Sequence, residues 1–147
     1  MMSDLENIYI DISEKAINYF SRAIELDPKN ALYFINKALW LKKRGNYQEA
    51  IDCYNKVTEL KSNNLEALKN KGICLFKISK YREAIESLNN AIALKSNDEE
   101  IFFYKGLCLN FIGNYKEAVD SYNRAIEINP NFFLAYNNKG NYLYYVI

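Results

Sequence analysis

The chain has 147 residues, half of them hydrophobic and a quarter charged, which is enough for one folded domain with a core. Nineteen basic and eighteen acidic residues leave a net charge of +1, which excludes bulk attraction to nucleic acid or to an anionic membrane. The chain contains no histidine, so it lacks the commonest general base and the commonest metal ligand.

The first thirty residues predict two helices. Apolar residues at helical spacing predict a short amphipathic helix over 4–12: Leu5, Ile8, Tyr9 and Ile12. A second helix is expected over 14–26, ending at Asp27-Pro28 because proline cannot continue a helix. Residues 1–30 are therefore interpreted as an atypical N-terminal half-unit, in which the short helix stands in for a missing first helix.

The following residues predict three helix pairs and a final single helix. Each unit contains two apolar runs at helical spacing, separated by short breaks rich in Gly, Ser and Asn. The three full units are 31–64, 65–98 and 99–132. Their expected helices are 31–43, 47–60, 65–77, 81–94, 99–111 and 115–128. Residues 133–147 predict a C-terminal half-unit with one helix over 133–146, which makes nine helices in the whole chain.

Two sequence motifs recur every 34 residues. The first motif is an asparagine or tyrosine followed by lysine and a small residue: Asn36-Lys37-Ala38, Asn70-Lys71-Gly72, Tyr104-Lys105-Gly106 and Asn138-Lys139-Gly140. The second motif begins with tyrosine and ends with alanine: Tyr47-Gln48-Glu49-Ala50, Tyr81-Arg82-Glu83-Ala84 and Tyr115-Lys116-Glu117-Ala118. Because two separate series keep the same phase, the chain is predicted to be a repeat protein.

From about residue 13 to the end, these motifs resemble the tetratricopeptide repeat (TPR). That family has a 34-residue unit with a small residue in the first helix and an aromatic residue at the start of the second. Two small residues follow in the second helix, represented here by Ala16 and Ala23, Ala50 and Val57, Ala84 and Ala91, and Ala118 and Ala125. The resemblance implies an all-α, right-handed solenoid of antiparallel helix pairs, forming a single domain over 1–147. Ser62 and Ser96 depart from the family pattern, which usually has proline there.

Nothing in the sequence predicts an enzyme, a cofactor or a metal site. Without histidine, the usual catalytic triads cannot be built. The three cysteines show no Cys-x-x-Cys spacing, and we expect Cys74 and Cys108 to be small buried side chains with a structural role. Residues 1–12 do not form a signal peptide, and no apolar run is long enough to span a membrane, so we expect a cytoplasmic setting.

In the family, the first helix of each pair lines the concave face, where partners bind. The residues expected on that face are Ile35, Asn36, Leu39, Lys69, Asn70, Ile73, Phe76, Phe103, Tyr104, Leu107, Phe111, Asn137, Asn138 and Asn141. An asparagine amide can pair with a peptide bond through one donor and one acceptor, so a ladder of Asn36, Asn70 and Asn138 could hold an extended peptide. The alternative is that these amides only face solvent, since Tyr104 interrupts the series.

The sequence predicts a protein or peptide partner. Residues 31–44 contain four basic residues and no acidic one, which favours some acidic character in the partner at that end. Binding of chaperone C-terminal tails is not expected, because Ile73, Tyr104 and Leu134 stand where the known carboxylate-binding family members have polar or basic residues. An RNA-binding repeat is a weaker alternative, since the third unit offers Glu99 and Glu100.

A further alternative is a self-assembling fragment of a longer array. The last helix is rich in apolar side chains that a single helix cannot all turn inward: Tyr136, Leu143, Tyr144, Val146 and Ile147. Terminal repeats need a polar outer face to remain soluble, and this helix lacks one. The sequence therefore predicts self-association through the C-terminal helix, with a symmetric homodimer as the simplest form.

Overall fold

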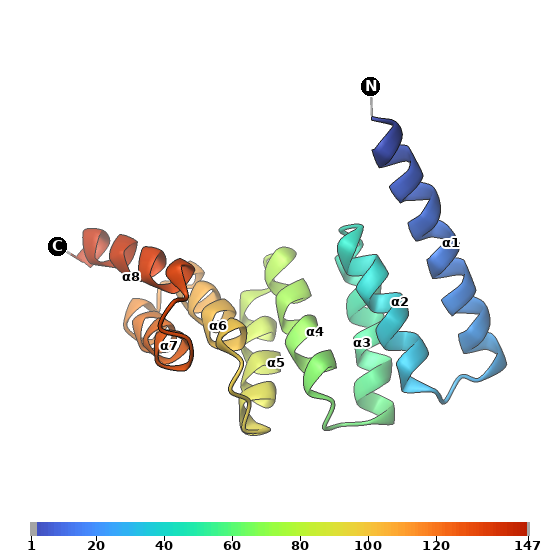
Figure 1. Ribbon diagram of the computed structural model, residues 1–147. Coiled ribbons are helices and arrows are strands. Elements are labelled where there is room, and N and C mark those ends of the chain that lie inside the picture. The colour runs from blue at the N-terminus through green and yellow to red at the C-terminus, as the bar shows by residue number, and fades with distance from the viewer. Residues whose placement is uncertain (1–2, 147) are drawn as a thin grey trace.

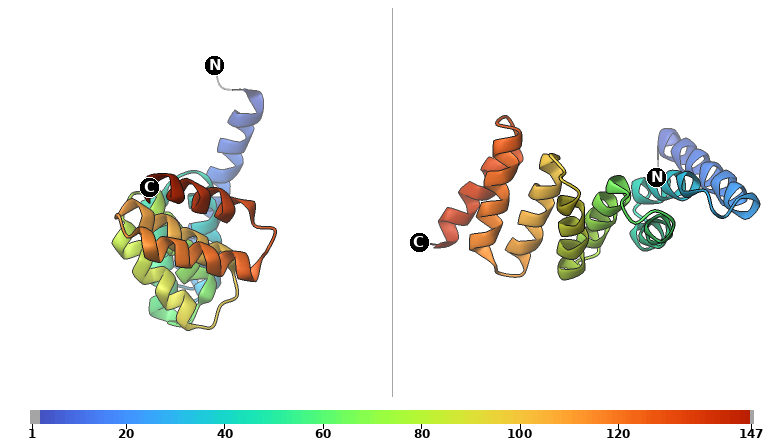
Figure 2. Two further views of the ribbon diagram at one scale, coloured as in Figure 1. Left: turned by 90° about the vertical axis from the view of Figure 1, so that its left-hand side faces the viewer. Right: turned by 90° about the horizontal axis from the view of Figure 1, so that it is seen from below.

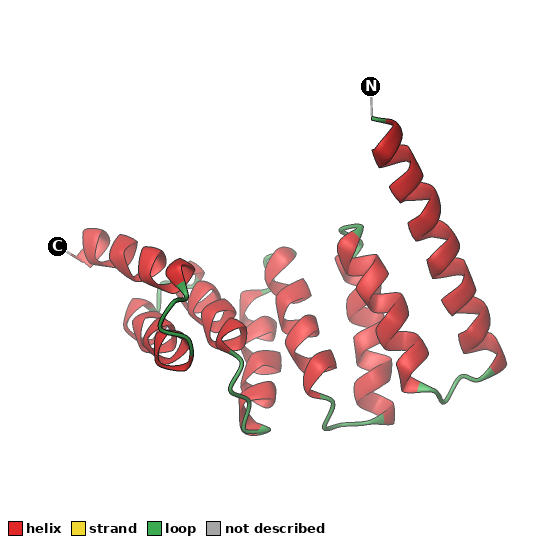
Figure 3. Cartoon of the chain, viewed as in Figure 1, coloured by secondary structure: helices red, strands yellow, loops and turns green. Residues whose placement is uncertain are grey.

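The computed structural model describes residues 3–146, and within that range it contains eight α-helices and no strand (Figure 1, Figure 3). The helices are α1 (Asp4–Leu26), α2 (Ala31–Lys43), α3 (Tyr47–Leu60), α4 (Leu65–Lys77), α5 (Tyr81–Ala93), α6 (Glu99–Phe111), α7 (Tyr115–Ile128) and α8 (Phe133–Val146). Each helix packs on the next, so the chain forms one row with its ends at opposite extremes (Figure 1, Figure 2). The predicted all-α solenoid of helix pairs is confirmed.

The prediction of nine helices is wrong, because the segments 4–12 and 14–26 form the single helix α1. No glycine or proline interrupts this segment, and Ser13 continues the helix by donating its Oγ hydrogen to the Ile10 carbonyl oxygen at 2.8 Å. Ser13 is fully buried, so the tertiary structure holds it in place at the expected break. As a result, the N-terminal half of α1 projects beyond the other helices (Figure 1, Figure 2).

The start of α1 carries a reciprocal cap. The Ser3 Oγ accepts a hydrogen bond from the Glu6 backbone N–H, and the Glu6 carboxylate accepts one from the Ser3 N–H. This pairing satisfies two backbone donors that the first turn of a helix otherwise leaves free. The described end of the chain is thus a properly terminated helix although its apolar side chains lie in water.

First and second helices of a pair begin in different ways. The first helices α2, α4 and α6 begin at Asn30, Asn64 and Asp98, whose side chains accept hydrogen bonds from the first-turn N–H groups. The second helices follow tight turns that contain one residue with positive φ: Gly45 (80°), Ser79 (64°) and Gly113 (81°). Glycine adopts this left-handed backbone conformation without steric conflict, whereas serine does not.

Close approach within each pair depends on the small residue of the first helix. A Cβ added to Gly72 would lie 2.7 Å from Leu88 Cδ2, and one added to Gly106 would lie 2.5 Å from Tyr122 Cε1. Leu88 and Tyr122 are almost fully buried. The glycines therefore provide the room in which a large side chain of the second helix is buried.

The three cysteines lie in the interior. Cys74 and Cys108 are fully inaccessible, and Cys53 is nearly so. Burial raises the pKa of Cys74 to about 11 and that of Cys108 to about 12. Both are therefore protonated thiols near neutral pH, as expected for packing residues rather than nucleophiles.

Replacing either packing glycine is expected to destabilise the fold. Gly72→Leu or Gly106→Leu overpacks the contact with the second helix and should lower the free energy of unfolding by ~1–3 kcal/mol or more, measured by urea denaturation. Gly140→Leu is the matched control, because nothing lies within 4 Å of its added Cβ. Leucine has the higher helix propensity, so this variant should be as stable as the parent or more so. Equal effects at Gly106 and Gly140 would contradict the packing role.

The turn before α5 offers a second test. Ser79→Gly removes the strain of a left-handed serine and should raise the free energy of unfolding by about 1 kcal/mol. Gly113→Ser introduces the same strain at the matched turn before α7 and should lower the free energy by a similar amount. Thermal melts of both variants would show opposite shifts in Tm, whereas shifts of the same sign would exclude this explanation.

Candidate functional site

The helices α2, α4, α6 and α8 together form one side of the row, here called the first-helix face. Contacts between successive first helices hold this face together. Lys42 Nζ on α2 donates to Asn70 Oδ1 on α4 at 2.5 Å. Phe76 on α4 packs edge-on against Tyr104 on α6, with ring centroids 5.4 Å apart. Residues far apart in the sequence therefore become neighbours on one continuous surface.

The residues predicted for partner binding differ widely in accessibility. Four are buried and serve mainly as core: Ile35, Asn70, Ile73 and Phe103. Seven are half-buried: Asn36, Leu39, Lys69, Phe76, Tyr104, Leu107 and Asn138. Three are exposed: Phe111, Asn137 and Asn141. The last ten can present part of a side chain to a partner, with most of the exposed area on α6 and α8.

The amides of the predicted asparagine ladder are partly engaged within the protein. Asn70 Nδ2 donates to the Glu66 carbonyl at 2.9 Å while its Oδ1 accepts from Lys42, so both ends of this buried amide are used. Asn138 Nδ2 donates to the Leu134 carbonyl at 2.8 Å. Asn138 is half-buried, and an amide has two donor hydrogens and an acceptor, so it keeps more capacity for a peptide than Asn70 does.

Aromatic rings form a connected cluster from α4 to the link between α7 and α8. Tyr81 and Phe111 stack with centroids 4.8 Å apart, and Phe76 touches both rings. On the other side of Tyr104, Phe103 packs edge-on against Phe132 at 5.2 Å. Paired rings of this kind are rigid and bring large apolar area at small entropic cost. The cluster thus gives the first-helix face a fixed aromatic floor.

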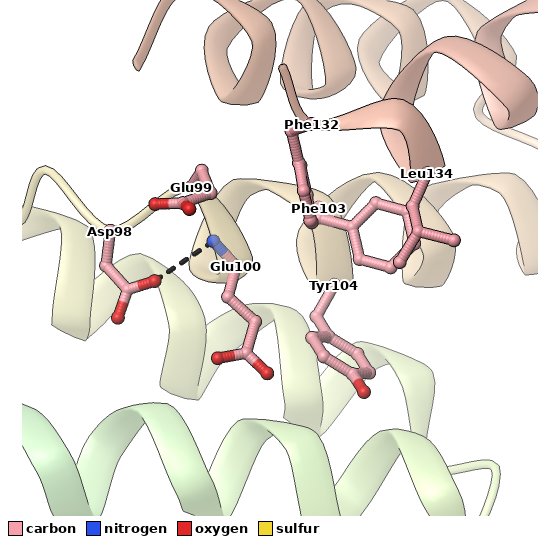
Figure 4. Close-up of a pocket in the computed structure, with 7 residues that line it drawn as sticks. All are labelled: Asp98, Glu99, Glu100, Phe103, Tyr104, Phe132 and Leu134. Atoms are coloured by element: carbon pink, nitrogen blue, oxygen red, sulfur yellow. Dashed lines mark hydrogen bonds between the residues drawn. The ribbon is translucent and has the colours of Figure 1, made fainter. Parts of the chain in front are cut away.

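A pocket of about 240 Å³ opens where α6 begins beside the start of α8. Its lining combines carboxylates with aromatic and aliphatic side chains: Asp98, Glu99, Glu100, Phe103, Tyr104, Phe132 and Leu134 (Figure 4). Asp98 caps α6 by accepting a hydrogen bond from the Glu100 N–H at 3.0 Å. The pocket is therefore built on a fixed helix start, with an apolar wall and an acidic rim.

Lys69 partly neutralises this acidic rim. Its Nζ lies 2.7 Å from the Asp98 carboxylate and 2.6 Å from that of Glu100. Burial alone would lower the pKa of Lys69, but the hydrogen bonds to the two carboxylates outweigh burial and leave the pKa raised. The pKa of Tyr104 is also raised, first by burial and then by the nearby Glu100 charge. Asp98 and Glu100 share the single lysine, and the third carboxylate, Glu99, accepts a hydrogen bond from Asn129 Nδ2 at 3.0 Å, so the rim keeps excess negative charge.

A second pocket, of about 360 Å³, lies towards the other ends of α6 and α8. Its lining is rich in amide and phenol groups: Asn110, Asn138, Asn141, Tyr142 and Tyr144. Both pockets lie between the same two helices, so they mark one track that runs along α6 and α8. The track begins at an aromatic, acidic hollow and ends at a neutral hydrogen-bonding one.

The sequence predicted Phe103 and Tyr104 at the start of this track and offered Glu99 and Glu100 in the same unit, but it did not predict Asp98 or Phe132. Glu100 and Leu134 are the second residues of their units, and Asp98 and Phe132 are the last residues of the units before. The 34-residue phase could have identified them, since each pair occupies one repeat position. Their approach depends on the link between α7 and α8, which the repeat pattern leaves undefined.

The described part of the chain meets the requirements of neither a metal site nor a membrane-spanning helix. Residues 3–146 contain no cluster of His, Cys, Asp and Glu that could hold a metal ion. None of the described helices is both long and apolar enough to cross a membrane.

Two family models match the sequence of this chain. Residues 13–91, just over half of the chain, match the family model described as "Anaphase-promoting complex, cyclosome, subunit 3". Residues 99–132 match the model of the tetratricopeptide repeat, with the boundaries of the third predicted unit. No curated protein matches at the level of sequence.

Several solved structures share the fold. A crystal structure of MamA is 24% identical with a TM-score of 0.87, and the match covers 97% of this chain and 84% of that chain. The first TPR domain of Spaghetti (RPAP3), bound to the HSP90 peptide SRMEEVD, is 28% identical with a TM-score of 0.77, covering 82% of this chain and 95% of that chain. The second TPR domain of human RPAP3, in complex with the HSP70 peptide SGPTIEEVD, is 24% identical with a TM-score of 0.73, covering 76% and 93%.

The repeat phase, the eight helices and these matches agree with one another. Domains of this kind are typically protein-interaction modules rather than enzymes. The chain belongs to the tetratricopeptide-repeat family.

Proposed function

We propose that the protein binds a peptide segment of a partner protein along the track between α6 and α8, and that it has no catalytic activity of its own. The observation that carries this proposal is the aromatic pocket at the start of the track, lined by Phe103, Tyr104 and Phe132. Rigid aromatic rings in a concave pocket are common anchoring points of protein interfaces.

The length of the track suits a short extended peptide. A helix of thirteen residues is about 20 Å long, and an extended chain advances about 3.3 Å per residue, so about six residues fit beside α6. One side chain of the peptide would fill the aromatic pocket. The amides of Asn138 and Asn141 would pair with its backbone at the other end of the track.

The charges favour different partner chemistry at the two ends of the face. Lys42, Lys43 and Arg44 at the end of α2 favour the acidic character predicted from the sequence. Asp98, Glu99 and Glu100 at the aromatic pocket instead favour a neutral or basic side chain. Acidic character is therefore proposed only for the part of the partner that lies near α2.

Chaperone tails remain an unfavourable partner class in this proposal. The peptides in the two RPAP3 structures end in Glu-Glu-Val-Asp. In this chain, Lys69 is already bound by two carboxylates, and Tyr104 stands at a position where carboxylate-binding relatives need a polar residue. An acidic tail would meet the carboxylate rim and be repelled.

The proposal predicts a loss of peptide binding when the ring of Tyr104 is removed from the aromatic pocket. Peptides selected from a random library on the parent protein would be titrated against Tyr104→Ala by fluorescence anisotropy, and Kd should rise about tenfold or more. Phe102→Ala is the matched control, because Phe102 is also a half-buried aromatic of α6 but faces Arg124 of α7. Equal loss in both variants, or none in Tyr104→Ala, would refute this site.

A second candidate function is self-association through α8. Its apolar side chains remain in water: Phe133 is 72% exposed, Tyr136 50% and Leu143 54%. Tyr144 is also exposed, while the side chains of Val146 and Ile147, included in the sequence prediction, lie outside the described residues. Full burial of a leucine side chain is worth ~1.5–3 kcal/mol, and the half-exposed Leu143 forfeits part of that free energy. Sedimentation equilibrium should therefore show an average mass that rises with protein concentration. A constant monomer mass would disprove self-association through α8.

A further inference from the structure

In a complete helix pair, a small residue of the first helix contacts a large residue of the second helix. Among the described helices, α8 offers only the small residue of this contact and α1 offers only the large one. The small first-helix residues form the 34-residue series Ala38, Gly72, Gly106 and Gly140. Large second-helix residues form a matching series, Phe20, Tyr54, Leu88 and Tyr122, in which Leu88 lies against Gly72 and Tyr122 against Gly106. Within residues 3–146, no large second-helix residue follows Gly140 in this phase, and no small first-helix residue precedes Phe20.

The structure shows an unfilled contact at Gly140. A Cβ added to Gly72 or Gly106 would meet Leu88 or Tyr122 within 3 Å, but nothing lies within 4 Å of a Cβ at Gly140. Beside this slot, Tyr136 and Leu143 are about half exposed. On α4 and α6, the second helix of the pair covers the corresponding surface. On α8, no helix within residues 3–146 covers this surface.

The complementary half is uncovered on α1. Ala50, Ala84 and Ala118, and likewise Val57, Ala91 and Ala125, are buried in the three complete pairs. The matching residues Ala16 and Ala23 are only half-buried, as is Phe20. Tyr19 is 78% exposed, although Cys53, Ser87 and Ser121 at its repeat position are buried. The part of α1 over residues 13–26 has the pattern of a second helix, and no first helix among the described residues covers this face.

We propose that α1 of a second copy of the chain packs on α8 and completes this open pair, with Phe20 of that copy in the slot at Gly140. The contact continues an interface that the chain already makes three times, in the pairs α2 with α3, α4 with α5 and α6 with α7. This proposal specifies the self-association through α8 given above, and it is independent of peptide binding. The arrangement is head-to-tail, because α8 of one copy meets α1 of the next and leaves the other two ends open.

A symmetric α8–α8 dimer fits the packing less well. It would place two first helices face to face, whereas in each complete pair a first helix packs closely on a second helix. Two first helices would also bring two Gly140 slots together and leave both unfilled. Only a second helix brings a large side chain to that position.

Two residues of α1 make the proposed contact between α8 of one copy and α1 of the next weaker than the contact within a complete helix pair. Lys15 stands at the repeat position of Glu49, Glu83 and Glu117, and Tyr19 is larger than the cysteine and serines at its position. Lys15 is bound to Asp11 at 2.8 Å within α1, which partly offsets its charge. We therefore expect reversible, concentration-dependent association rather than a permanent assembly.

Analytical ultracentrifugation of the 147-residue chain tests the proposal with two blocking variants. Gly140→Leu fills the slot on α8, and Tyr19→Glu places a charge in the contact face of α1 without touching the core. Each should weaken self-association about tenfold or more, since a filled slot or a buried charge opposes close packing. Asn89→Leu, which adds a leucine to an exposed position of α5, is the control and should associate like the parent.

Mixing the two variants distinguishes the modes of assembly. Gly140→Leu keeps an intact α1 face and Tyr19→Glu keeps an intact α8 face, so a mixture should form a 1:1 dimer that does not grow further. A parent chain that stays monomeric overturns both this proposal and the self-association on which it rests. If the parent associates but Tyr19→Glu associates equally well, head-to-tail pairing is rejected and symmetric α8 pairing is retained.

Discussion

The row of helices depends on how closely the two helices of each pair approach each other. Leu88 and Tyr122 occupy the space that a side chain at Gly72 or Gly106 would fill. One small and one large residue therefore fit together in each of these pairs. Because the contact recurs every 34 residues, each pair presents nearly the same surface to its neighbour, and the pairs stack in one direction. The core is therefore a series of local contacts between successive helices, and α1 and α8 lie at opposite ends of the row (Figure 1).

This arrangement explains why the candidate binding face is preformed. The first helices lie side by side because the second helices hold them, and the side contacts between Lys42 and Asn70, and between Phe76 and Tyr104, link one repeat to the next. The aromatic pocket beside Tyr104 is fixed by the cap at Asp98 and by the ring contact of Phe103 with Phe132. A preordered face loses little conformational entropy on binding, which favours recognition of a flexible peptide.

The same stacking rule accounts for the two ends of the described helices. Within a solenoid every helix pair buries one face on each neighbour, so the outermost helices keep an uncovered face. On α8 this face carries Gly140 and exposed aromatic side chains, and on α1 it carries Ala16, Tyr19 and Ala23. The proposed peptide binding and the proposed end-to-end association therefore involve different surfaces and can be tested separately.

The sequence by itself determined the helix pairs, their 34-residue phase and the glycine contacts, because these are local patterns repeated several times. It also identified Phe103, Tyr104 and Asn138 as residues of the first-helix face. Only the tertiary structure decided that α1 is continuous, since the burial of Ser13 depends on neighbouring packing. It alone showed that Asn70 is already bound by Lys42, and that Asp98, Glu100 and Phe132 meet in one pocket, because those contacts join different repeats through the geometry of their links.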